Sequence, residues 1–198
     1  MLHTRLIAPV SELLERHVKE RPHKVAYWDA ARSVTYSQLA DRTASIAAGL
    51  SGTGVREGDR IAIYLPNGVD WIEACLAGLR SGAVIVPISY DAAEAEIAYR
   101  LSDADCRTVI TSPVRKDIVT RLAAGLNGPV SLVFAGAGAR ETGLCLEQLA
   151  EGSADAAPDP ADIDRSSFII YTAAPRASFC RSVECYGLPL RAGRRSAI

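Results

Sequence analysis

Lysine, long apolar runs and paired cysteine motifs are scarce in this 198-residue chain. No apolar stretch reaches the roughly 18 residues that a membrane-spanning helix needs. The N-terminal segment has an acidic residue by Glu12 and no long apolar core, which is not typical of a signal peptide. None of the five cysteines forms a C-x-x-C pair, so we expect reduced thiols in a cytoplasmic protein rather than a metal or redox motif.

The charge is nearly balanced, with a net value of −1. Because the chain has no strong global field, it is not expected to recruit nucleic acid or an acidic membrane surface. Lys19, Lys24 and Lys116 are the only lysines among 22 basic residues, and alanine is abundant, which indicates a GC-rich gene. The hydrophobic content of 48% is typical of a globular protein, and the length fits one domain or one and a fraction.

Amphipathic helices alternate with short apolar strands along most of the chain. One helix start is marked by Thr35 and Gln38, which form a T-x-x-Q capping box. Such alternation predicts an α/β fold with mostly parallel strands. The pattern predicts helices over about 10–20, 36–50, 71–79, 94–105, 113–126 and 144–149, and strands over 25–29, 33–36, 60–65, 83–87, 106–111, 130–134 and 167–172.

Two isolated features could suggest a ligand, and each has a plainer interpretation. The glycines of residues 135–139 (AGAGA) would let backbone amides approach a phosphate. However, the segment lacks the G-x-G-x-x-G spacing and a following Lys-Ser/Thr, so we favour a flexible turn. His17 lies on the apolar stripe of the first helix with no second ligand nearby, so we expect a packed histidine.

A series of motifs resembles one family in both order and spacing. The matching segments are 34–39 (VTYSQL), 58–67 (GDRIAIYLPN), 76–87 (LAGLRSGAVIVP), 96–101 (EIAYRL), 108–111 (TVIT) and 169–172 (IIYT). In this order they are similar to the N-terminal part of the adenylate-forming (AMP-binding) superfamily, which includes AMP-forming acyl-CoA synthetases, aryl acid–CoA ligases, peptide-synthetase adenylation domains and luciferase. The resemblance covers residues 8–172 and implies an incomplete N-terminal portion of the large synthetase domain.

The resemblance implies a parent enzyme that activates a carboxylic acid with ATP and Mg²⁺ and then transfers the acyl group to a thiol, usually that of coenzyme A. Tyr171 and Thr172 would border the nucleotide's phosphate loop, and they are the cofactor-binding candidates. No catalytic residue and no metal ligand is expected within this chain. Because the chain starts directly with these motifs, a free-standing acid–CoA ligase is favoured over a peptide-synthetase adenylation domain.

The match fails immediately after Thr172. The family continues with Ser-Gly-Thr-Thr-Gly-x-Pro-Lys-Gly, whose amides, hydroxyls and lysine wrap the ATP phosphates. Residues 173–178 of this chain read Ala-Ala-Pro-Arg-Ala-Ser instead. Written as GCG GCA CCA CGG GCA AGC and preceded by one A, the same bases encode Ser-Gly-Thr-Thr-Gly-Lys. The sequence therefore predicts a frameshift after the Thr172 codon, with a naturally divergent tail as the alternative, and a chain without ATP, Mg²⁺ or coenzyme A bound.

Residues 173–198 form a second region with no clear periodicity. This tail carries five arginines, no lysine and one acid, Glu184, and we expect it to be disordered. Phe168, Ile169 and Ile170 would then lie beside exposed surface, on a strand with an unpaired edge. The alternative to an enzyme fragment is a non-enzymatic truncated product or an interaction fragment. The identity of the acid and the oligomeric state cannot be read from the sequence.

Overall fold

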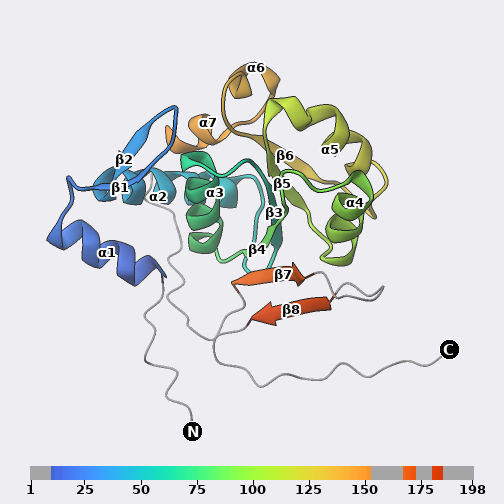
Figure 1. The fold of residues 1–198 in the computed structure, drawn as a ribbon, viewed down its shortest axis with the longest axis horizontal. Helices are drawn as coiled ribbons and strands as arrows, with labels where there is room; N and C mark the ends of the chain where they lie inside the picture. Colours follow the sequence, from blue (N-terminus) through green and yellow to red (C-terminus); the bar gives the residue numbers. More distant parts are fainter. Residues whose placement is uncertain (1–9, 153–166, 173–179, 185–198) are drawn as a thin grey trace, which may run out of the picture.

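The structure, a computed structural model, describes residues 10–152, 167–172 and 180–184. In this part of the chain, six strands form one sheet in the order β6-β5-β3-β4-β7-β8, and two more form a separate antiparallel hairpin, β1-β2 (Figure 1). The sheet is parallel from β6 to β7, and only β8 runs against its neighbour. The strands are β1 (Val25–Trp28), β2 (Ser33–Thr35), β3 (Arg60–Tyr64), β4 (Val84–Pro87), β5 (Thr108–Thr111), β6 (Ser131–Phe134), β7 (Phe168–Thr172) and β8 (Cys180–Glu184).

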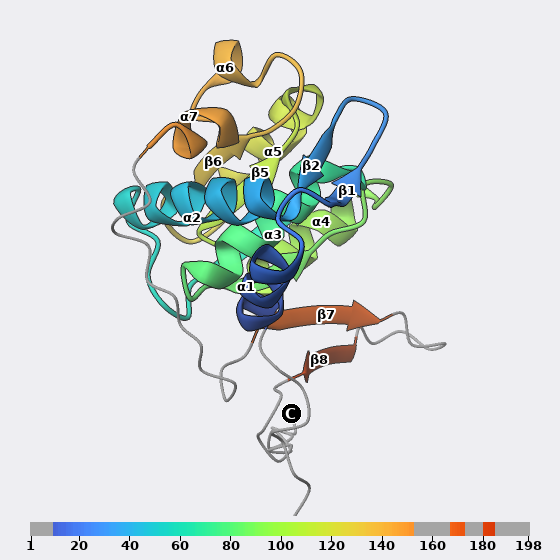
Figure 2. The same cartoon turned by 90° about the vertical axis from the view of Figure 1, so that its left-hand side faces the viewer.

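Helices lie on both sides of this sheet in Figure 1, and Figure 2 looks onto the side covered by α2 and α3. One face packs against α2, α3 and α7, and the other against α4 and α5. The strands between them are apolar on both faces, as is usual for a covered parallel sheet. The helices are α1 (Val10–Glu20), α2 (Tyr36–Gly52), α3 (Val69–Arg80), α4 (Glu94–Asp103), α5 (Lys116–Ala123), α6 (Ala139–Thr142) and α7 (Leu146–Ala150), and a 3₁₀ turn (Pro113–Arg115) precedes α5.

The predicted α/β alternation is confirmed, and so is the capping box. The Gln38 amide donates to Thr35 Oγ1 at 3.3 Å, and the Thr35 amide donates to Gln38 Oε1 at 2.9 Å. These two bonds begin α2 directly after the hairpin strand β2. His17 packs on the ring of Tyr36, with a centroid distance of 4.8 Å, as expected for a packed histidine. Within the described residues, no helix is both long and apolar enough to cross a membrane.

The connections between strands define a point at which the strand order reverses. Helix α3 leads from β3 to β4 on one side, whereas α4 leads from β4 back across to β5 on the other side of β3. The carboxyl ends of β3 and β5 are therefore neighbours whose following loops diverge. In open α/β sheets, ligands bind in the crevice at such a topological switch point.

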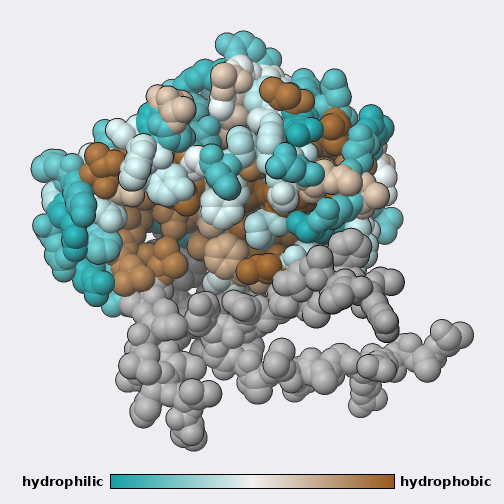
Figure 3. All heavy atoms as spheres, in the orientation of Figure 1, coloured by the Kyte–Doolittle hydropathy of each residue, from teal (hydrophilic) through white to brown (hydrophobic). Residues whose placement is uncertain are grey.

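Strands β7 and β8 correct one expectation from the sequence. The outer edge of β7 is not unpaired, because β8 pairs with it from Phe168 opposite Glu184 to Thr172 opposite Cys180. Ile169 is buried and Phe168 partly buried, so Ile170, at 37% exposure, is the most exposed of the three. Figure 3 shows hydrophilic side chains over α1 and apolar ones beside it, toward the β7 side of the body. The rest of the predicted disordered tail lies outside the described residues.

Candidate functional site

A pocket of about 290 Å³ opens at the carboxyl edge of the sheet, at the switch point. The loops after β3, β4, β5 and β6 form its walls, and the turn of the β1–β2 hairpin forms one side. Because these loops are brought together only by the parallel sheet, the pocket has no continuous sequence motif. Its lining residues are Asp29, Leu65, Pro66, Asn67, Gly68, Asp70, Tyr90, Ser112, Pro113, Val114, Ala135, Gly136 and Ala137.

The first wall is the N-terminus of α3, which is capped by a residue distant in sequence. Gly68 stands at the N-cap position and has no side chain to offer, so Asp29 Oδ2 accepts the amide of Val69 at 2.8 Å. The other oxygen, Oδ1, accepts the amides of Ala31 and Arg32. The hydrogen bonds from Val69, Arg32 and Ala31, in that order, hold the pKa of Asp29 below its ordinary value.

Gly68 is required at this point by space rather than by backbone angle. A Cβ built on Gly68 would lie 2.9 Å from Asp29 Oδ2. Its φ of 169° is extended backbone that any residue adopts. The Pro66-Asn67-Gly68 break that ends β3 in the sequence therefore also admits the capping carboxylate.

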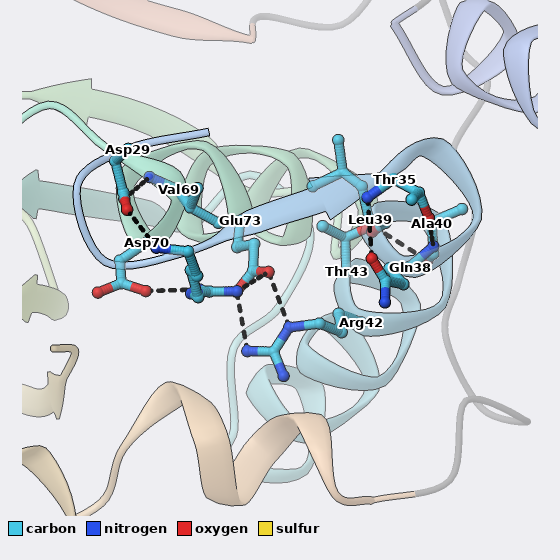
Figure 4. Close-up of polar contacts among 11 residues, drawn as sticks. Asp29, Thr35, Gln38, Leu39, Ala40, Arg42, Thr43, Val69, Asp70 and Glu73 are labelled. Carbon is cyan, nitrogen blue, oxygen red and sulfur yellow. Dashed lines mark hydrogen bonds and ion pairs between the residues drawn. The ribbon is translucent and has the colours of Figure 1, made fainter. Parts of the chain in front are cut away.

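Behind this wall lies a buried carboxylate, Glu73, which is fully inaccessible to solvent (Figure 4). Arg32 donates to its two oxygens at 2.9 and 2.8 Å, and Arg42 donates at 2.7 and 2.9 Å. Arg32 also donates to Asp70 Oδ1 at 2.6 Å. Burial raises the pKa of Glu73, but the hydrogen bonds from Arg32 and Arg42 outweigh it, so the carboxyl stays ionised with a pKa below its ordinary value.

Sequence reasoning missed this charge cluster, although a signal was present. Asp70 and Glu73 lie three residues apart on a helix that is otherwise largely apolar, so the two carboxylates are neighbours on one face of α3, of which Glu73 is buried and Asp70 is partly exposed. A buried acid demands a cationic partner. The sequence offers many arginines and does not say that Arg32 and Arg42 are the ones that reach it.

The opposite wall is aromatic. The hydroxyls of Tyr90 and Ser112 are 2.9 Å apart, and the Arg115 guanidinium lies 4.6 Å from the centroid of the Tyr90 ring. Arg115 also donates to the Tyr90 carbonyl at 3.2 Å and lies over the ring of Tyr64. These contacts hold the β4 and β5 loops together, so the pocket combines a mostly apolar body with hydroxyls on one side and carboxylates on the other.

The predicted site residues Tyr171 and Thr172 are not brought to this pocket. The Tyr171 ring is buried against α4, where its hydroxyl donates to Asp103 Oδ2 at 2.6 Å and Arg100 lies over the ring. The backbone of Thr172 pairs with Cys180, and its side chain is outside what the structure describes. Residues 173–179, where the family has its phosphate loop, also lie outside the described residues, so the nucleotide role of Tyr171 and Thr172 stays a prediction.

The AGAGA segment forms a turn, with Gly136 and Gly138 at φ values of 92° and 75°. It contributes Ala135, Gly136 and Ala137 to the pocket rim. Among the described residues, no group of three His, Cys, Asp or Glu side chains is placed to hold a metal ion. Burial raises the pKa of the Cys75 and Cys106 thiols to about 12, which keeps both protonated and unreactive.

Comparison with known proteins gives the family. The sequence model described as "AMP-binding enzyme" matches residues 14–173. A feruloyl-CoA synthase from Amycolatopsis sp is 34% identical over 110 residues, covering 56% of this chain and 22% of that protein. An acetyl-coenzyme A synthetase from Magnetococcus marinus is 31% identical over 186 residues, covering 80% of this chain and 28% of that protein.

Solved structures agree with the fold. A benzoate CoA ligase from Burkholderia xenovorans superposes with a TM-score of 0.71 at 26% identity, covering 84% of this chain and 33% of that one. An anthranilate CoA ligase in complex with anthranoyl-AMP gives a TM-score of 0.82 at 19% identity, covering 94% and 36%. The chain spans less than a third of the length of each of the two curated relatives named above. Since the family match takes in most of its residues, the chain belongs to the AMP-binding enzyme family and corresponds to its N-terminal part.

Proposed function

We propose that this chain is the N-terminal scaffold of an AMP-forming acid–CoA ligase. The observation that carries the proposal is that the family match ends at residue 173, one residue past the end of β7. In the family, the phosphate loop begins at that point. The parent enzyme would convert a carboxylic acid and ATP to an acyl-adenylate and pyrophosphate, and then form the thioester with coenzyme A. A peptide-synthetase adenylation domain is the alternative parent.

The residues of this chain do not fit the ATP phosphates. Ala173–Ser178 contributes no lysine and no paired glycines where the family has both. The described pocket does not replace that loop, because Asp29 and Asp70 place two carboxylates on its wall and like charges repel a triphosphate. Removing even one preorganised donor from such a site costs about 10²–10³ in kcat. We therefore propose that the chain by itself is inactive.

Exchange of labelled pyrophosphate into ATP tests this proposal. The purified 198-residue chain should give no acid-dependent exchange with acetate, benzoate or ferulate, because the phosphate grip is missing. The full-length feruloyl-CoA synthase of Amycolatopsis serves as the positive control with ferulate. Exchange by the chain above an enzyme-free blank would show that it is a working enzyme.

We further propose that Tyr171 and Thr172 border the parent's nucleotide site. The support is positional, since they end β7 and immediately precede the segment that replaces the loop. The Tyr171–Asp103 hydrogen bond fixes this end of the strand to α4. The three described cysteines are free thiols, which supports a reducing, cytoplasmic location.

A lost base after the Thr172 codon accounts for the abrupt end of the match. The shifted frame restores Ser-Gly-Thr-Thr-Gly-Lys from residues 173–178. The next two codons of the shifted frame encode Phe or Leu and then Leu. The Pro-Lys pair of the family's loop can therefore be encoded only two codons later than in the family. Sequencing the locus decides the matter. A missing base with synthetase motifs downstream in the shifted frame is the expected result, and an intact frame without such motifs would refute the account.

A non-enzymatic product is the second candidate, and one observation favours it. Strand β8 covers the edge of β7, where the sequence predicted an exposed and aggregation-prone strand. A chain whose apolar strand β7 is covered by the more polar strand β8 is able to persist as a stable fragment. Sedimentation and a thermal melt test this candidate: a soluble species with one cooperative transition supports it, and aggregation on purification opposes it.

A further inference from the structure

The β1–β2 hairpin stands apart from the main sheet. Its two strands pair only with each other, and no hydrogen bond of the sheet ladder reaches them among the described residues. At its base, the hairpin is tied to the chain around it by backbone bonds from Tyr36 to the Lys24 carbonyl and from Ser37 to the Pro22 carbonyl. Its tip must therefore be held to the body by side chains.

The tip is held by charge. The turn between the strands carries Asp29, which caps α3, and Arg32, which donates to Glu73 and Asp70. Arg32 forms three of these four tip contacts, and its side chain is 31% exposed. The guanidinium group of Arg32 therefore makes most of the side-chain hydrogen bonds that hold the hairpin tip to α3.

Apolar burial is concentrated away from the turn. Val34 is buried in a cluster with residues of α1, α2 and α3, and Ala26 and Tyr27 pack against this cluster. Next to the turn, by contrast, Trp28 is 73% exposed. Segments with few buried apolar contacts open at a lower free energy than the core, in cooperative units. The hairpin tip has few buried apolar contacts, whereas strand β5 of the main sheet is buried along its whole length.

We propose that residues 25–35 form a strap that closes the hairpin side of the pocket and opens as a unit when Arg32 releases Glu73. Opening carries Asp29 away from the pocket wall and leaves the amide of Val69 uncapped. It also exposes the loop Pro66–Gly68, against which the Asp29 carboxylate now lies. The inference rests on these contacts and not on the reaction of the parent enzyme.

Hydrogen exchange measured by mass spectrometry and NMR tests the strap in the full chain. Arg32→Met keeps an unbranched, flexible side chain, although a shorter one, and removes the guanidinium and its charge. Exchange in residues 25–35 and at the Val69 amide should become at least about tenfold faster, because the tip loses its fastening. Exchange in β3 and β5 should stay slower than in residues 25–35 in both proteins, because these core strands exchange only through opening of the whole fold. Arg21→Met is the matched control, since the ion pair of Arg21 is with its exposed neighbour Glu20.

Two results would overturn the proposal. Unchanged exchange in residues 25–35 would show that Arg32 is not the fastening. Equal protection of residues 25–35 and of β3 and β5 would show that the charge cluster holds the whole fold and that no separate strap exists. If Arg32→Met does not fold, Asp29→Asn takes its place, because it keeps the shape of the cap and weakens its acceptance of the Val69 amide. The same regional pattern is then expected with a smaller change, and its absence would refute the strap.

Discussion

Strands β3, β4 and β7 belong to one sheet, yet they are held in different ways. β3 pairs along its length with β4 on one side and β5 on the other, whereas β7 pairs with β4 only where Phe168 meets Ile85. Ile85 is completely buried and Ile170 is 37% exposed. Strands β4 and β7, which carry these two isoleucines, are both uncharged and apolar on two faces. The difference in burial therefore comes from the elements that cover the strands and not from their composition.

The same substitution in β4 and in β7 tests this difference in burial most directly. Ile85→Ala should lower the free energy of unfolding by about 2–5 kcal/mol, because it leaves a cavity beneath α3. Ile170→Ala should cost about 1 kcal/mol or less, since part of its surface already contacts solvent. Chemical denaturation of the two variants measures the difference. Equal losses would mean that β7 is as firmly integrated as the core.

Helix packing on the body gives a second, smaller effect. A Cβ on Gly49 of α2 would lie 2.8 Å from Leu149 Cδ2 and 2.9 Å from Leu149 Cβ, whereas one on Gly52 would meet nothing within 4 Å. Gly49→Ala should therefore destabilise the body by about 1–3 kcal/mol through overpacking against α7. Gly52→Ala, on the same helix, should be neutral or stabilising by up to about 1 kcal/mol. Thermal melts compare them, and a stabilising Gly49→Ala would contradict this packing.

The attachment of β7 to α4 is expected to be weaker still. Tyr171→Phe removes the hydroxyl that donates to Asp103 and should cost about 0.5–1.5 kcal/mol. Because β7 barely pairs with β4, the loss should appear as faster hydrogen exchange in β7 with little change in β3. Asp103→Asn provides the second arm of a double-mutant cycle. Additive effects of the two variants would show that the hydrogen bond contributes nothing.

Acid should affect the hairpin side of the body before it affects β7. The pKa values of Asp29 and Glu73 are both lowered in the fold, so their contribution to stability is complete above the ordinary carboxyl values of 3.8 and 4.5. That contribution is lost as the pH falls through the lowered values. Between pH 7 and pH 5 the melting temperature should therefore change little on their account, and hairpin protection should fall first below that range. Hydrogen exchange at several pH values checks the order.

The sequence predicted what depends on neighbouring residues. Thr35 and Gln38 predicted the start of α2, and the apolar run of residues 60–65 predicted a buried strand. Both signals could be read because capping and periodicity depend on residues that are close in sequence. Strand β8 was missed because Cys180–Glu184 (CRSVE) has no apolar run and only one β-branched residue, and its pairing with β7 is tertiary. The pocket was missed for a similar reason, since its lining comes from five separate segments.

The predicted binding residues illustrate the other limit. Tyr171 and Thr172 were chosen by resemblance to a motif, and a motif locates residues along the chain without orienting them. The structure turns the Tyr171 side chain toward α4. Asp29 and Glu73 carried no motif, and only the approach of the hairpin to α3 gives them their partners.

The short pairing of β4 with β7, with one pair of residues in register, also bears on the order of assembly. Neighbouring strands β3 and β4 are joined by one helix, whereas Ile85 and Phe168 are more than 80 residues apart in the chain. Closing such a long loop for one short pairing is slow relative to local contacts. During synthesis, the strands from β3 to β6 can associate while residue 168 has yet to be added. We therefore expect β7 and β8 to dock last, onto a body that is already formed.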